Sequence, residues 1–392
     1  MDFAFTQEEE RFREELREFL VQELPDWWVG MFAHDERIMP LTKQLCQKMA
    51  AKGWLTMSWP IQYGGRAASP WLQMVLREEM WGHGEPRGPQ YMSLNYIGPM
   101  IMKFGTEAQK QRFLPPMSRG EVLWCQGFSE PDAGTDLVAL RCRAEDRGDH
   151  FQVNGQKIWT SYANAPADWC LLLVRTDPAS SRHAGISVLL VDMTTPGVTV
   201  RPIESMAGPN EVNEVFFDDV VVPRACLLGE QDQGWQSILY GLRFERSGIA
   251  WHARGAQMLD LLVEHCKRTE LDGVRLADRP EVRAKLAELY LRIEAARLLC
   301  YRVASMLEHD EEPVTEVGVA FALGGRSWQL AAMAGLEILG PYGQLDRDDE
   351  TAPMRGRMSM EWVESIVGTL GAGTQEAQKN LVARGLGLPK AG

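Results

Sequence analysis

The feature that most constrains the fold is a change of rhythm along the chain. Between residues 121 and 230 the sequence carries short, strand-like apolar runs, whereas longer helical patterns precede and follow this segment. These runs lack intervening helices, which favours an antiparallel barrel or sandwich over a parallel sheet. Asn154-Gly155 separates two possible strands and predicts a hairpin turn. The strand-like runs are 151–153, 169–174, 186–191, 198–200 and 215–217.

Helical signals lie on both sides of the β segment. Thr6 followed by Glu9 is a capping box, so a first helix is expected to begin there. Helical pieces continue to about Arg119, with breaks at 64–65 and at the Gly- and Pro-rich stretch 82–89. A later helix repeats apolar residues in a 4,3 alternation that is typical of helix bundles. This stripe consists of residues 282, 286, 289, 293, 296, 300, 303 and 307.

The order of these segments predicts an α+β protein with three domains. At 392 residues the chain exceeds what one hydrophobic core normally serves. We expect an N-terminal α-helical domain at 1–120, a middle β domain at 121–230 and a C-terminal α-helical bundle at 231–392.

The composition limits the partners and the compartment. A formal net charge of -13 argues against binding nucleic acid or anionic membranes, although a local basic pocket could still take a small anion. The seven Cys are scattered without a C-x-x-C pair, which suits neither a disulfide framework nor a metal site. No apolar run is long enough to cross a bilayer. We therefore expect a soluble protein of the reducing cytoplasm.

Several common enzyme signatures do not occur in this sequence. There is no G-x-G-x-x-G opening a βαβ unit, no P-loop, no H-E-x-x-H and no G-x-S-x-G. The sequence thus lacks the motifs by which four enzyme classes are usually identified, namely nicotinamide dehydrogenases, P-loop enzymes, zincins and α/β-hydrolases. If this chain is a redox enzyme, it must bind its cofactor in a fold other than those that carry these motifs.

Two polar residues interrupt an apolar stripe in the helix expected after about Gly234. Glu245 and His252 both occupy positions that its 4,3 rhythm turns inward. Burial raises the pKa of a carboxyl group toward the range useful for a general base. An ion pair with a neighbouring helix is the commoner role for such a Glu, and spacing alone leaves both interpretations open. For His252 we expect a satisfied core histidine or a helix-packing residue.

The motifs of the chain resemble those of the acyl-CoA dehydrogenase family. Ser-Glu-Pro-Asp-Ala-Gly-Thr-Asp at 129–136 and Asn-Gly-Gln-Lys-Ile-Trp-Thr-Ser at 154–161 match two of its signatures, and Pro-Gly-Val follows at 196–198. Further matches are Phe-Gly-Thr-Glu at 104–107, Glu245-Arg246, Gly-Thr-Gln-Glu at 373–376 and Leu-Gly-Leu-Pro at 386–389. They follow the family's order over nearly the whole chain. The resemblance implies the family's fold, which has a helical domain, an antiparallel β-barrel and a helical bundle.

The resemblance also implies a noncovalently bound FAD and a homotetramer in which a neighbouring subunit completes the flavin site. Arg268 matches the arginine that meets the FAD pyrophosphate across the subunit interface, and a guanidinium suits a diphosphate. Glu337 and Pro341 depart from the Gln and second Gly of many relatives, which puts contacts from that region in doubt. The residues implied to bind the cofactor are Gln126, Phe128, Ser129, Gly134, Thr135, Trp159, Ser161, Arg268, Glu337, Gly340, Thr374 and Glu376.

For the reaction, the family removes the α proton of an acyl-CoA with a carboxylate and passes a hydride from the β carbon to flavin N5. Many relatives carry that carboxylate in a C-terminal Glu-Gly-Thr, but Ala372 stands at this position here. One branch of the family instead uses a Glu before Arg in the first helix of the C-terminal domain, which Glu245 matches. The resemblance thus implies Glu245 as the base, with Thr135, Arg246, Ala372 and Gly373 as substrate contacts.

Two alternatives stay open. A flavin oxidase or monooxygenase could share this fold and differ only in using oxygen in place of an electron-transferring flavoprotein. The chain could also be the noncatalytic subunit of a heteromer, although a Glu on the buried stripe counts against this. The sequence does not identify the acyl group.

Overall fold

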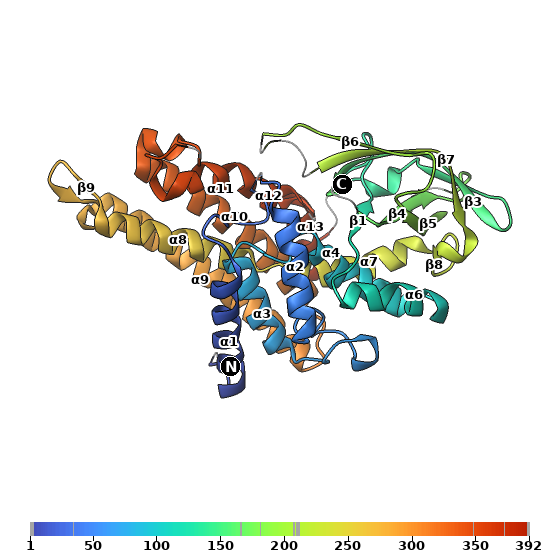
Figure 1. The fold of residues 1–392 in the computed structure, drawn as a ribbon, viewed down its shortest axis with the longest axis horizontal. Coiled ribbons are helices and arrows are strands. Elements are labelled where there is room, and N and C mark those ends of the chain that lie inside the picture. The colour runs from blue at the N-terminus through green and yellow to red at the C-terminus, as the bar shows by residue number, and fades with distance from the viewer. Residues whose placement is uncertain are drawn as a thin grey trace. The chain divides into compact units, whose positions relative to one another are not determined.

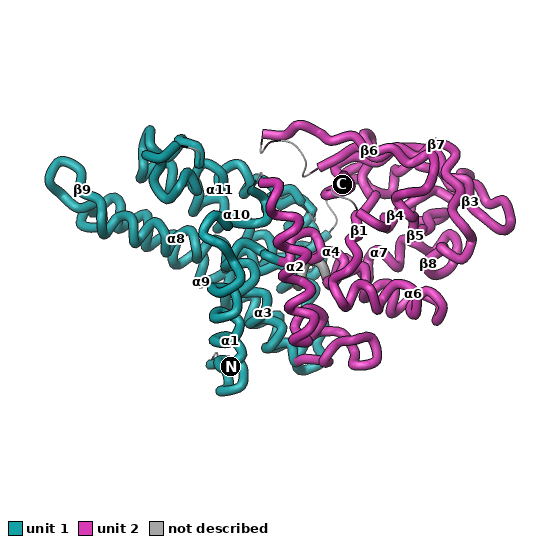
Figure 2. Tube along the Cα trace, viewed as in Figure 1, with its two compact units in different colours: residues 1–33, 69–86, 246–392 teal, residues 34–68, 87–245 magenta. Residues whose placement is uncertain are grey.

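The computed structural model describes residues 4–33, 35–164, 167–180, 182–206, 208, 212–347, 349–371 and 373–389, without the side chains of 245–248. The chain forms two compact units, drawn in different colours in Figure 2. Unit 1 consists of Met1–Ala33, Ser69–Pro86 and Arg246–Gly392, and unit 2 consists of His34–Ala68 and Arg87–Glu245. Each unit therefore joins segments that are far apart in the sequence.

The N-terminal part of the chain is helical, as predicted (Figure 1). The hydroxyl of Thr6 accepts a hydrogen bond from the Glu9 N–H at 3.3 Å, and the Glu9 carboxylate accepts one from the Thr6 N–H at 2.7 Å. This capping box satisfies donors that the first helical turn leaves free, so the predicted helix start is confirmed. The helices are α1 (Gln7–Glu23), α2 (Ile38–Ala51), α3 (Pro70–Gly82), α4 (Gln90–Met92), α5 (Gly98–Phe104) and α6 (Glu107–Ser118).

The middle part forms one sheet, in which β6, β7, β3, β2, β4, β5 and β8 follow in this order and β1 also pairs with β4. The predicted strand runs all lie within β3 to β7. β1 and β2 run parallel to β4, and the other described pairings of this sheet are antiparallel. The strands are β1 (Trp124–Gly127), β2 (Arg143–Asp146), β3 (His150–Ser161), β4 (Trp169–Arg175), β5 (Ile186–Asp192), β6 (Val198–Pro202), β7 (Val212–Pro223) and β8 (Leu227–Leu228).

Long helices return in the last part of the chain, and the predicted stripe lies on α9. Of its residues, Val282, Leu289, Ile293, Ala296 and Val303 are buried, and α9 packs with α8 and α10 in unit 1. Within the described residues, no helix meets the length and hydropathy that a membrane span requires. The elements are α7 (Gly234–Gly248), α8 (Trp251–Arg268), β9 (Glu270–Leu271), β10 (Val274–Arg275), α9 (Pro280–Glu308), α10 (Val314–Leu339), α11 (Arg357–Ser365), α12 (Val367–Leu370) and α13 (Gln375–Gly385). The predicted order of a helical, a β and a helical part is therefore confirmed, but the sheet of the middle part is mixed rather than wholly antiparallel.

The hairpin predicted at Asn154-Gly155 is wrong. Both residues lie inside β3, where the pairing with β7 shifts register between Val153 and Gly155. Gly155 has a φ of +145°, and a Cβ added to it would lie 2.7 Å from the Cα of Cys142. Glycine is required here by a bulge and a close approach of backbone rather than by a turn.

The single helix predicted after Gly234 is also interrupted. α7 ends at Gly248, and α8 begins at Trp251. The Trp251 ring stacks on Trp328 of α10 with centroids 4.9 Å apart and meets Trp81 of α3 edge-on at 4.5 Å. An apolar period that continues through residues 249–250 cannot reveal this break, because the position of Trp251 depends on helices distant in the sequence.

Candidate active site

In unit 2, Glu130 shapes the loop that carries the 129–136 motif. Glu130 and Ala133 exchange two backbone hydrogen bonds of 3.0 Å, which closes a tight turn. The buried Glu130 carboxylate also accepts hydrogen bonds from the backbone N–H groups of Arg141, at 2.6 Å, and Cys142, at 2.9 Å. The loop is therefore fixed to the chain that leads into β2.

A buried ion pair joins this loop to the 154–161 motif in β3. The Lys157 ammonium is fully buried and lies 2.7 Å from the Glu130 carboxylate, and it donates a second hydrogen bond to the Phe128 carbonyl at 3.0 Å. The Ile158 N–H donates to the Ser129 carbonyl at 2.9 Å. Two motifs that are separate in the sequence thus form one structural element.

Trp159 stands out on this element because it is both exposed and strained. The residue is 57% exposed, and its φ of +59° is unusual for a large residue. The pairing of β3 with β7 shifts register between Lys157 and Thr160, which places Trp159 in the irregular stretch. Bulges and positive φ values of this kind concentrate at binding sites.

The other predicted cofactor residues of unit 2 lie near this loop. The side chain of Gln126 contacts the Tyr96 hydroxyl, and the Tyr96 ring meets that of Phe128 edge-on with centroids 6.3 Å apart. Gly134 and Thr135 are exposed, and a Cβ added at Gly134 would meet nothing within 4 Å. Gln126, Phe128, Ser129 and Ser161 are half-buried.

Sequence reasoning assigned no role to Lys157, Glu130 or Tyr96. Lys157 has the same strand parity as the buried Phe151 and Val153, so its inward direction was available from the alternation. A buried Lys needs a carboxylate, but the sequence alone did not point to Glu130. Tyr96 carried no comparable signal.

In unit 1 the predicted residues fall into two groups along α10. Thr374 is the N-cap of α13, and its hydroxyl accepts a hydrogen bond from the Ala377 N–H at 3.2 Å. The Gln375 side chain donates to the Ala322 carbonyl of α10 at 3.0 Å. Glu376 is exposed in the first turn of α13.

The second group lies near the other end of α10. Glu337 forms an ion pair with Lys285, and Gly340 follows the helix with a φ of +58°. Arg268 ends α8 with a largely exposed side chain that lies 3.2 Å from Glu264. Ala322 and Glu337 are separated by about 22 Å along α10, at 1.5 Å per residue. The structure of one chain therefore does not bring the two groups together.

The residues implied in proton abstraction are only partly described. Glu245 and Arg246 belong to the last turn of α7, but their side chains lie outside the described residues. Ala372 also lies outside the described residues. Gly373 is half-buried and has a φ of +108°, which favours glycine.

Sequence models of three acyl-CoA dehydrogenase domains match the chain. The N-terminal domain matches residues 6–121, the middle domain matches 125–220 and the C-terminal domain matches 232–387. The chain belongs to the acyl-CoA dehydrogenase family. It is therefore an oxidoreductase that acts on acyl-CoA.

Individual relatives can be aligned with this acyl-CoA dehydrogenase over its full length. The acyl-CoA dehydrogenase FadE26 of Mycobacterium tuberculosis is 32% identical over 100% of both chains. The crystal structure of the ChsE4-ChsE5 complex from the same organism contains a chain with 32% identity and a TM-score of 0.90 over 100% of both chains. A structure described as Tcur3481-Tcur3483 steroid ACAD gives the same identity, TM-score and coverage.

The residues of unit 2 fit the flavin that this family uses. The exposed indole of Trp159 offers a flat apolar face, and Thr135 adds an exposed hydroxyl. Open space around Gly134 allows a ligand to approach the backbone closely. The buried Lys157–Glu130 pair supports both sides of this surface.

Proposed function

We propose that this acyl-CoA dehydrogenase removes one hydrogen from each of the α and β carbons of an acyl-CoA thioester and releases the trans-2-enoyl-CoA. The observation that carries the proposal is the element in unit 2, where a buried ion pair holds the 129–136 loop beside the exposed Trp159. FAD, bound noncovalently, supplies the hydride acceptor at its N5 atom. An electron-transferring flavoprotein is the proposed next acceptor.

The proposed cofactor contacts come from two subunits. The separation along α10 supports this division, because Glu337 and Gly340 lie far from Thr374 within one chain. Arg268 is exposed at the end of α8, where a neighbour's diphosphate would replace Glu264 as its partner. One subunit would contribute Gln126, Phe128, Ser129, Gly134, Thr135, Trp159, Ser161, Thr374 and Glu376, and the neighbour Arg268, Glu337 and Gly340.

Glu245 is the proposed base for the α proton. Its place in the last turn of α7 agrees with the family branch that carries Glu before Arg in this helix. Ala372 has no side-chain group that can take a proton, but its backbone N–H could hydrogen-bond the thioester oxygen and stabilise the developing enolate. Thr135, Arg246 and Gly373 complete the proposed substrate contacts.

We propose a bulky, steroid-like acyl group, because a full-length structural relative is described as a steroid ACAD. Purified protein with one FAD per subunit should oxidise steroid-like CoA esters with kcat/KM about 10-fold or more above that for short straight-chain esters. Reduction of a dye acceptor under anaerobic conditions measures this. Equal kcat/KM values for steroid-like and short straight-chain esters would contradict the substrate proposal. Colourless protein that FAD cannot reconstitute would contradict the dehydrogenase assignment, as would turnover that produces peroxide in air but does not reduce the dye.

The surface of α9 supports assembly into an oligomer. Ala284, Ala287, Leu291, Ala295 and Leu298 are exposed at 3,4 spacing, which makes an apolar stripe opposite the buried one. We propose a homotetramer. An unlike partner is the second candidate, because the ChsE4-ChsE5 and Tcur3481-Tcur3483 structures each name two proteins.

Leu291→Arg tests the assembly. Leu291 is 67% exposed, so this charge should leave the subunit folded but shift a wild-type tetramer to smaller species in sedimentation velocity. Val21→Arg, at a position of α1 that is 76% exposed, is the control and should not change the assembly. Wild-type protein that is a monomer with full activity would refute the tetramer. FAD loading that requires a second, unlike chain would favour the heteromer.

We further propose that the enzyme works in the cytoplasm, in a step of β-oxidation. All seven cysteines are free in the structure, which fits a reducing compartment.

A further inference from the structure

Helix α8 begins in a way that its own sequence does not favour. Its N-cap, Ala250, makes no side-chain hydrogen bond, and its first turn holds no acidic residue. Instead, His252 and Arg254 bring positive groups to the end of the helix that already carries the positive pole of the dipole. Both side chains are only 2% exposed. The start of α8 must therefore be stabilised by partners from other elements.

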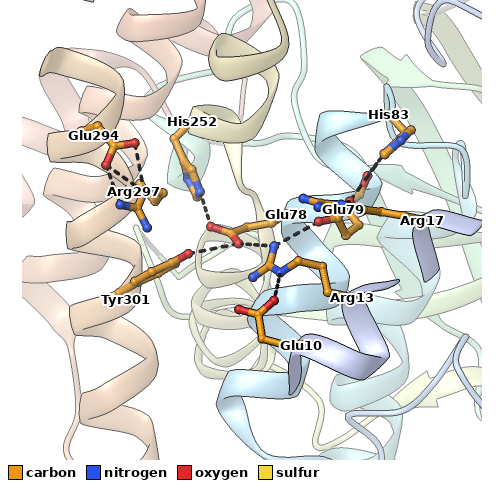
Figure 3. A network of polar contacts seen from close by, with 10 residues as sticks. All are labelled: Glu10, Arg13, Arg17, Glu78, Glu79, His83, His252, Glu294, Arg297 and Tyr301. Atoms are coloured by element: carbon orange, nitrogen blue, oxygen red, sulfur yellow. Dashed lines mark hydrogen bonds and ion pairs between the residues drawn. The ribbon is translucent and has the colours of Figure 1, made fainter. Parts of the chain in front are cut away.

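The partner of His252 is Glu78 of α3. The imidazole Nε2 lies 3.0 Å from one Glu78 oxygen, while Arg13 of α1 and Tyr301 of α9 donate to the other oxygen at 3.0 and 3.2 Å. Figure 3 shows these three side chains converging on the same carboxylate. His252 is thus buried, as predicted, and its Nε2 is held by a carboxylate that also ties α1 and α9 to α3.

The charges of this cluster reinforce one another. Burial alone would lower the pKa of His252, but Cys300 and Glu78 outweigh it and raise that pKa to about 10. Burial alone would raise the pKa of Glu78, but His252 and Arg13 hold it below its usual range. At neutral pH the contact is therefore an ion pair.

Arg254 has an equally specific partner in Glu361 of α11. Its guanidinium binds both oxygens of this fully buried carboxylate and donates to the Val29 carbonyl at 3.0 Å. The Trp328 indole donates to the same carboxylate at 2.7 Å. A Cβ added at Gly30 would lie 2.6 Å from the Arg254 guanidinium, so glycine is needed to make room for it.

We propose that the first turn of α8 is an anchor that positions the last turn of α7 for proton abstraction. This α8 anchor consists of His252 with Glu78, Arg254 with Glu361, and Trp251 packed on Trp328. The inference rests on the proposed function, because the last turn of α7 carries Glu245, the proposed base.

The physical reason is that α8 cannot slide or rotate without breaking buried contacts. Either movement would separate both ion pairs and leave charges uncompensated in the interior. Only residues 249–250 separate the two helices, so a fixed start of α8 limits where α7 can end. A misplacement of a reacting group by about 1 Å can cost about 10²-fold in rate.

The test is His252→Leu, which removes the ion pair and fills much of the same volume. Glu78 keeps its ion pair with Arg13 in this variant, so its charge stays compensated and the variant should fold. We measure α-proton exchange in D₂O with an acyl-CoA analogue that has no β hydrogen and cannot be oxidised. Exchange should fall about 10- to 10²-fold. FAD content and the Kd of the analogue should stay within two-fold of wild type.

Two variants separate positioning from general destabilisation. His252→Gln can still donate a hydrogen bond to Glu78 and should restore exchange to within a few-fold of wild type. Tyr301→Phe removes the hydrogen bond that the Tyr301 hydroxyl donates to the same Glu78 carboxylate, and it leaves α8 unchanged. It should lower the Tm but leave exchange within two-fold.

The outcomes are decisive in each direction. Wild-type exchange in His252→Leu, with exchange abolished in Glu245→Gln, overturns the anchor and keeps the base. Exchange that falls only in proportion to lost FAD makes His252 merely structural and also overturns it. Normal exchange in Glu245→Gln refutes the base, and the anchor role with it. If His252→Leu does not fold, Glu78→Leu carries the same expectations, because it removes the carboxylate that holds His252 while Arg13 keeps its ion pair with Glu79.

Discussion

Glu245→Gln is expected to slow flavin reduction by an acyl-CoA substrate by about 10² to 10⁴-fold, the usual cost of losing a positioned general base. Gln keeps the shape and most of the hydrogen bonding of Glu but cannot take the α proton. FAD content and substrate binding should survive, because neither requires proton abstraction. Anaerobic stopped-flow measurement of flavin bleaching gives the rate, and titration with the substrate gives its Kd.

Glu376→Gln is the control for this prediction. Glu376 is the carboxylate that follows the position of Ala372 by four residues, and it is exposed in the first turn of α13. Its loss should lower the rate of flavin reduction by a few-fold at most. If Glu376→Gln is inactive and Glu245→Gln is active, the base is misassigned, although the family assignment stands.

The regular parts of the fold were predictable because their signals are local. Thr6 and Glu9 are close enough in sequence to form the capping box. The apolar stripe of α9 likewise indicates which face of a single helix is buried. The error at Gly155 has a different cause. A glycine in a turn and a glycine that admits a neighbouring backbone look the same in the sequence, and only the approach of Cys142 distinguishes them.

The candidate site could be predicted only in part for the same reason. Trp159 and the 129–136 loop were found through motifs, but their attachment depends on the pairing of Lys157 with Glu130, 27 residues earlier in the chain. The stripe containing His252 correctly indicated an inward side chain. It could not identify Glu78, which lies 174 residues away and reaches His252 only because α3 packs against α8.

Lys157→Met is expected to destabilise unit 2 strongly and to lower its FAD content. Met has nearly the length of Lys but no charge, so Glu130 would remain buried and ionised without its cation. Breaking a buried pair in this way costs about 3–5 kcal/mol. The Phe128 carbonyl would also lose its hydrogen bond, which loosens the loop beside Trp159. Thermal unfolding and the absorbance ratio of flavin to protein measure the two effects.

Two comparisons show whether burial and charge cause this loss. Arg224 and Asp146 form an ion pair of the same 2.7 Å length on the surface of unit 2, where a pair is worth about 1 kcal/mol or less. Arg224→Met should therefore change the Tm little and leave FAD content intact. Adding Glu130→Gln to Lys157→Met removes the uncompensated charge, while the amide oxygen can still accept one of the two backbone hydrogen bonds that Arg141 and Cys142 donate to Glu130. The double variant should recover part of the lost stability. If the single and double variants are equally unstable, the loss comes from packing around Lys157 rather than from a stranded carboxylate.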